Sequence, residues 1–181
     1  MFQILINYSG LSLGETEVIN NLFEGYNIYQ FNIDNDFEFA SILEIEFIKD
    51  DEIPFFDIIS IEKWSFLIEI IKNIKKRRGK KGLRFKLVIT EIFKIDKEHQ
   101  EPKILRRVVF ILNQKSDIDF IKGLERIEIS IENLDEIYRF HEIKEEKITN
   151  NRFDKHKDQD SQNNTRFFIF NEDIRKWTMI K

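Results

Sequence analysis

The chain has 181 residues, of which 41% are hydrophobic and 34% charged, with a formal net charge of −4. It contains no cysteine, which excludes disulfide bonds, thiolate metal ligands and cysteine nucleophiles. Because no apolar run is long enough to span a membrane and the first residues do not resemble a signal peptide, we expect a cytoplasmic protein that makes no membrane contact.

The first third of the chain predicts a β-α-β unit followed by two further strands. Apolar residues alternate with polar ones in the expected strands and recur every three to four residues in the helix. Two sequential strands joined by a helix are parallel and right-handed when they share a sheet. The expected elements are a strand at 2–8, a helix at 14–24, and strands at 26–33, 36–48 and 55–59.

The clearest helix is predicted at 61–78. Ser60 is a suitable N-cap and Gly79 a suitable C-terminal stop. Apolar side chains from Ile61 to Ile74 recur at helical spacing. Seven of the ten residues at 72–81 are basic, and cations are favourable at a helix C-terminus because they offset its dipole.

The second half predicts more strands, a polar interruption and an apolar ending. We expect strands at 83–95, 104–112, 126–132 and 166–170, one or two helical turns at 117–123, and either a helix or a strand at 134–143. The segment 144–165 is almost wholly polar and is typical of a flexible loop.

Together these elements predict an α+β fold: a mixed, largely antiparallel sheet with one long amphipathic helix at 61–78 and a shorter helix at 14–24. Residues 1–143 form a single α+β domain in this interpretation. Residues 166–181 form a C-terminal strand and apolar segment that returns to the body or docks on a partner.

Charge is sorted along the sequence. Residues 1–71 hold 14 acidic and 2 basic side chains, whereas residues 72–115 hold 15 basic and 4 acidic ones. The remainder, 116–181, has 15 acidic and 12 basic side chains. Such sorting produces either an internal electrostatic match or two binding faces of opposite sign.

Both interpretations name specific residues. In the internal match, Glu38, Glu44 and Glu46 face Arg84, Lys86 and Lys94 across paired strands. Strand phase also turns Phe85 away from Arg84 and Lys86, which weakens the case for stacking on nucleic-acid bases. In the binding interpretation the basic contacts are Lys75, Lys76, Arg77, Arg78, Lys80, Lys81 and Arg84, and the acidic contacts are Asp50, Asp51 and Glu52.

Catalytic and metal sites have little support. His99, His141 and His156 lack the i, i+4 spacing of helix-borne metal ligands. A metal-dependent nuclease would use Glu142 and Lys144 with Asp57 or Asp135, but such Glu-x-Lys tripeptides arise by chance in a chain this charged. We therefore assign no catalytic residue, no metal ligand and no cofactor.

The sequence favours a non-catalytic intracellular binding protein, a complex subunit, adaptor or inhibitor, that acts on another protein through segregated acidic and basic surfaces. The alternative is a nucleic-acid-binding protein that uses the basic 72–86 region with Arg106 and Arg107. A metal-dependent nuclease is the third hypothesis. The partner and the oligomeric state remain open at this point.

Overall fold

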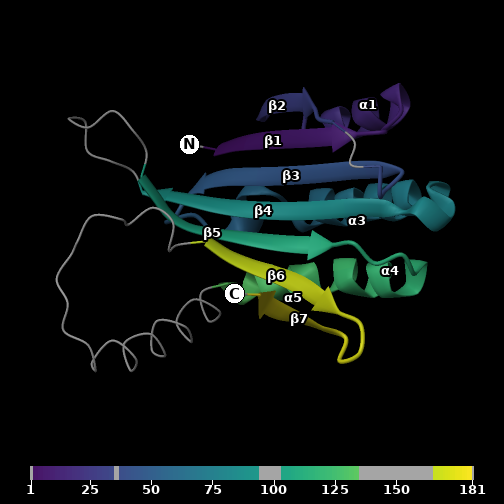
Figure 1. Cartoon of the computed structure of the whole chain (residues 1–181). Coiled ribbons are helices and arrows are strands. Elements are labelled where there is room, and N and C mark those ends of the chain that lie inside the picture. Colours follow the sequence, from purple (N-terminus) through teal and green to yellow (C-terminus); the bar gives the residue numbers. More distant parts are fainter. Residues whose placement is uncertain (1, 35–36, 94–102, 135–164, 181) are drawn as a thin grey trace.

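The computed structural model describes residues 2–34, 37–93, 103–134 and 165–180 (Figure 1). Its centre is a seven-stranded sheet in the order β2-β1-β3-β4-β5-β6-β7. The strands are β1 (Phe2–Ser9), β2 (Asn27–Asn32), β3 (Ser41–Asp50), β4 (Leu83–Phe93), β5 (Lys103–Leu112), β6 (Thr165–Asn171) and β7 (Lys176–Ile180). The α-helices are α1 (Leu13–Leu22), α2 (Phe55–Ile58), α3 (Ile61–Arg77), α4 (Asp117–Glu125) and α5 (Ile127–Glu132), and a short 3-10 helix, η1 (Gly79–Lys81), follows α3.

Parallel and antiparallel pairings alternate across this sheet. β1 and β2, β3 and β4, and β5 and β6 are parallel neighbours. The pairs β1 and β3, β4 and β5, and β6 and β7 are antiparallel. The expected α+β class with a mixed sheet is therefore confirmed, and antiparallel pairs make up half of the described pairings.

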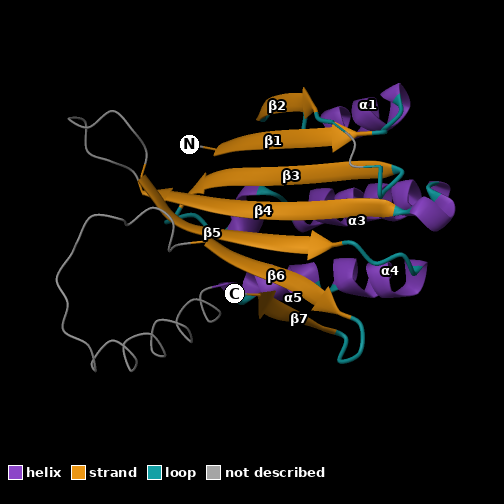
Figure 2. Cartoon of the chain, viewed as in Figure 1, coloured by secondary structure: helices purple, strands orange, loops and turns teal. Residues whose placement is uncertain are grey.

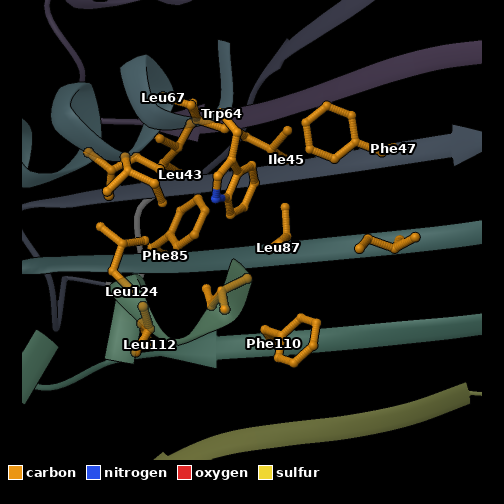
Figure 3. Close-up of a cluster of buried hydrophobic side chains, with 14 of the residues drawn as sticks. Leu43, Ile45, Phe47, Trp64, Leu67, Phe85, Leu87, Phe110, Leu112 and Leu124 are labelled. Atoms are coloured by element: carbon orange, nitrogen blue, oxygen red, sulfur yellow. The ribbon is translucent and has the colours of Figure 1, made fainter. Parts of the chain in front are cut away.

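The described helices cover one face of the sheet (Figure 2). Side chains that alternate along the strands point to this face, among them Leu43, Ile45 and Phe47 of β3, and all three are buried. They pack against Trp64 and Leu67 of α3 (Figure 3). The opposite face of the sheet carries no described helix, and this asymmetry sets the location of the candidate surfaces.

The two predicted amphipathic helices are present and capped as their sequences suggest. At α1, the Ser12 hydroxyl accepts from the backbone N–H of Glu15, and the Glu15 carboxylate accepts from the backbone N–H of Ser12. At α3, the Ser60 hydroxyl accepts from the backbone N–H of Lys63. Gly79 follows the last turn with φ of +54°, a conformation that favours glycine.

Two predicted strands are wrong. Residues 126–132 alternate Ile with polar residues, but they form α5, in which Ile127 and Ile131 lie one turn apart and are buried while Ile129 is 60% exposed. Residues 55–58 form the short helix α2, with Pro54 at its N-cap. The predicted strand at 36–48 begins only at Ser41. Residues 135–143 and 144–164 lie outside the described part of the chain.

The C-terminal segment joins the same sheet. β6 pairs with β5, and β7 then forms the sheet edge by pairing with β6. Trp177 and Met179 of β7 alternate toward the helix-covered face and pack against the core. The apolar ending predicted from the sequence is therefore a strand.

Candidate binding surfaces

The predicted basic contacts lie where α3 ends and β4 begins, but they do not share one environment. Lys75 is fully buried. Its Nζ lies 3.2 Å from a carboxylate oxygen of Asp117 and donates to the carbonyl of Lys115 at 2.9 Å. Lys75 therefore attaches the end of α3 to the start of α4 and is not accessible to a partner.

Arg78 is also held within the fold. Its guanidinium is hydrogen-bonded to the Glu15 carboxylate and donates to the Gly10 carbonyl at 3.2 Å. Burial raises the pKa of Glu15, but the Ser12 backbone N–H and the Arg78 guanidinium outweigh burial and hold this pKa below its usual value. These contacts join the end of α3 to the first turn of α1 and to the loop after β1.

Four of the remaining basic side chains face solvent. Lys76, Lys80 and Lys81 are exposed and make no ion pair among the described residues. Arg77 is also exposed, with its Nη2 3.5 Å from a carboxylate oxygen of Glu15. We call Lys76, Arg77, Lys80 and Lys81 the basic end.

The predicted acidic contacts lie at the other end of the sheet. Asp50 closes β3 and is buried, Asp51 is half-buried and Glu52 is exposed. β3 spans ten residues and runs parallel to β4, so its end lies roughly 30 Å from the start of β4. The acidic and basic contacts therefore form two separate regions.

A cavity of about 340 Å³ opens beside the acidic contacts. Asp51 and Glu52 line it together with Lys49, Glu91 and Arg106. The Glu91 carboxylate is buried between Lys49, whose Nζ is 2.6 Å away, and the guanidinium of Arg106. This buried ion network links β3, β4 and β5, so Arg106 is not available at the basic end as the nucleic-acid hypothesis requires.

Paired charges occupy the centre of the uncovered sheet face. Glu44 of β3 lies 3.0 Å from Lys86 Nζ and 3.9 Å from Arg84 Nη2 on β4. These contacts match the predicted cross-strand pairing. Glu38 lies before β3, where its backbone carbonyl accepts from Lys115, and Lys94 lies outside the described residues.

Glu46 continues the same paired band. It accepts from Thr90 Oγ1 at 2.6 Å and lies 2.9 Å from Arg107 Nη2. Glu44 and Glu46 together neutralise most of the positive charge of Arg84, Lys86 and Arg107 on this face. Arg84 and Arg107, two of the residues required for nucleic-acid binding, are thus engaged with carboxylates.

Exposed apolar side chains lie on both sides of the paired band. Tyr29 and Phe31 of the edge strand β2 are 48% and 52% exposed. On the other side, Phe167 of β6 lies opposite Ile180 of β7, and both are exposed. We call the paired band and these apolar margins the open face. Our sequence interpretation missed it because strand phase shows which residues share a face but not which face the helices cover.

The described residues offer no metal site: among them, no three His, Cys, Asp or Glu side chains are grouped so that they could hold an ion. Asp57 is exposed on α2. Its proposed nuclease partners Glu142 and Lys144, and the alternative Asp135, lie outside the described residues. The nuclease hypothesis therefore remains a prediction from sequence.

Comparison with known proteins finds no matching family model, no matching curated protein and no matching solved structure. No helix in the described part of the chain is long and apolar enough to cross a membrane.

Proposed function

We propose that this chain is a non-catalytic binding protein, acting as a complex subunit, adaptor or inhibitor, that holds another protein against the open face. The observation that carries the proposal is the combination of exposed apolar margins with a centre whose charges are already paired. Exposed apolar patches mark contact surfaces, and aromatic and arginine side chains are enriched where proteins meet. Tyr29, Phe31 and Phe167 supply the aromatic part.

The basic end defines the chemistry of the partner. It adjoins the start of β4, where Arg84 belongs to the open face, so one partner can contact both regions. Lys76, Lys80 and Lys81 have no ion pair among the described residues and favour an acidic patch on that partner. Complementary charge of this kind raises the association rate and orients the encounter. The partner is therefore a protein with an acidic patch beside an apolar one.

A capture experiment tests the open face. The full chain, tagged and purified, is mixed with lysate of its source cells, and the captured proteins are quantified by mass spectrometry. The double variant Tyr29→Ser/Phe31→Ser is compared with Phe66→Ser, a matched control because Phe66 is exposed on α3, on the other side of the sheet. We expect the wild type and the control to capture one protein in similar amounts. The amount captured by the double variant should be about tenfold lower.

A charge reversal tests the basic end. In Lys76→Glu/Lys80→Glu/Lys81→Glu the association rate with the captured protein should fall about tenfold or more, and Lys122→Glu on α4 should leave it unchanged.

Equal capture by the wild type and the Tyr29/Phe31 variant would rule out the open face as the contact surface. Loss of the captured material on nuclease treatment would favour the nucleic-acid alternative.

A further inference from the structure

A second cavity, of about 440 Å³, lies on the helix-covered side of the sheet near its β7 edge. It is separate from the open face and from both charged ends. The strands contribute Phe110, Phe168, Lys176 and Trp177, and the region of α5 contributes Arg126, Ile129 and Ser130. Its volume falls in the range of about 300–1,000 Å³ that is usual for small-molecule sites.

Aromatic rings form one wall of this cavity. Phe110 and Phe168 are stacked with ring centroids 5.5 Å apart, and Trp177 meets Phe110 edge-on at 5.1 Å. Ile129 lines the cavity from α5 and is 60% exposed, so it adds apolar surface beside the aromatic wall. The wall therefore suits a flat apolar group.

The polar groups around this wall are donors. Arg126 and Lys176 are exposed and form no ion pair among the described residues, and no acidic side chain is found among the described residues that line the cavity. The indole Nε1 of Trp177 is buried and has no hydrogen-bond acceptor in the described part of the chain. A buried donor without an acceptor is unfavourable, so an acceptor supplied by a ligand is favoured. Two cations and an indole N–H together match a carboxylate.

We propose that this cavity binds a small amphipathic anion, with a planar apolar body against Phe110, Phe168 and Trp177 and a carboxylate between Arg126 and Lys176. The carboxylate accepts charge-assisted hydrogen bonds from the two cations, and the indole N–H of Trp177, which lines the same cavity, is a third donor. The apolar body buries Ile129. This site is independent of the proposed protein contact on the open face.

Ligand charge provides the first test. Isothermal titration calorimetry on the full chain compares 1-naphthoate with two probes of similar shape, neutral 1-naphthalenemethanol and cationic 1-naphthylmethylamine. We expect saturable one-to-one binding of the naphthoate, about tenfold weaker binding of the alcohol, and no measurable binding of the amine. Absence of naphthoate binding, or binding of the amine as tight as that of the naphthoate, would overturn the proposal.

Matched variants locate the binding. Arg126→Gln and Lys176→Gln should each weaken naphthoate binding about tenfold, whereas Lys122→Gln on neighbouring α4 should leave it unchanged. Trp177→Phe keeps an aromatic ring but removes the donor, and should weaken binding by about threefold to tenfold. Naphthoate binding that is unaffected by both cation variants would place the ligand elsewhere and contradict the assignment.

Discussion

Adjacent lysines at the end of α3 have opposite roles. Lys75 is fully buried and holds the Lys115 carbonyl and Asp117, whereas Lys76 is exposed. The difference could be predicted from helical spacing, because Lys75 lies four residues after Ile71 and therefore on the same buried face of α3. Our sequence interpretation treated the whole basic run as one group and therefore missed it.

This difference predicts unequal effects on stability. Lys75→Met keeps the length of the side chain but loses the hydrogen bond to the Lys115 carbonyl, and should lower the free energy of unfolding by about 1–2 kcal/mol. Lys76→Ala should change it by less than about 0.5 kcal/mol. Urea unfolding followed by circular dichroism measures both values. Similar effects of the two substitutions would contradict the structural role of Lys75.

Glu15 makes stability depend on pH. Its pKa is lowered in the folded state from an ordinary value of 4.5, so the ionised form stabilises the fold. This contribution is fully present above the pKa of the unfolded chain and is lost as pH falls through the lower folded pKa. Loss of the stabilisation from Glu15 should therefore begin below about pH 4.5.

The variant Glu15→Gln removes this titration together with the ion pair to Arg78. We expect it to lower the free energy of unfolding by about 2 kcal/mol at neutral pH, with a difference from the wild type that shrinks as the medium becomes acidic. Urea unfolding at several pH values measures this change. Glu17→Gln, an exposed position on the same helix, is the control. A constant difference across the acidic range would argue against the lowered pKa.

At the scale of elements, helices and strands are predicted best from the sequence where capping residues and periodicity agree. Both predicted helices are found close to their predicted bounds, and Ser60 and Gly79 mark the ends of the longer one. Residues 126–132 were predicted as a strand because every second residue is apolar. That short pattern also places Ile127 and Ile131 on one side of a helix, and packing in the core selects the helix.

The packing of α4 on the sheet rests on a close approach at Gly123. A Cβ added there would lie 2.5 Å from Cδ2 of Leu112 and 3.0 Å from Cγ of Phe170. Gly123→Ala should therefore force α4 away from β5 and β6 and lower the free energy of unfolding by about 1–3 kcal/mol.

Gly14→Ala is the matched control, since a Cβ at Gly14 meets nothing within 4 Å and alanine favours the helix α1. It should be neutral or stabilise the protein by up to about 1 kcal/mol. Thermal unfolding of the two variants measures the contrast. Equal stability of Gly123→Ala and the wild type would show that α4 is not seated against Leu112 and Phe170.

For the whole molecule, the sorted charge has two separate explanations. Part of it is pairing inside the fold, because the strand order places acidic β3 beside basic β4. The other charged side chains lie in two regions: the basic end beside the start of β4, and the acidic contacts at the end of β3, roughly 30 Å away. The cross-strand pairing of Glu44 with Lys86 could be predicted from strand phase. The open face could not, because it depends on where α1, α3 and α4 lie relative to the sheet.

This arrangement predicts a gain of function that separates protein binding from nucleic-acid binding. Glu44 and Glu46 match the charge of Arg84, Lys86 and Arg107 on the open face and would repel phosphates. The double variant Glu44→Gln/Glu46→Gln frees these three cations close to the exposed rings of the same face. Its affinity for an oligothymidylate should exceed that of the wild type by about tenfold or more at low salt.

Fluorescence anisotropy at increasing salt measures this affinity, and Glu17→Gln/Glu24→Gln on the α1 side is the control with the same change in net charge. If the effect came from net charge alone, both double variants would gain equally. Tight binding of the oligothymidylate by the wild type, with a steep salt dependence, would instead favour the nucleic-acid alternative. A gain confined to Glu44→Gln/Glu46→Gln would show that these two carboxylates oppose nucleic-acid binding at the open face, as the proposed protein contact requires.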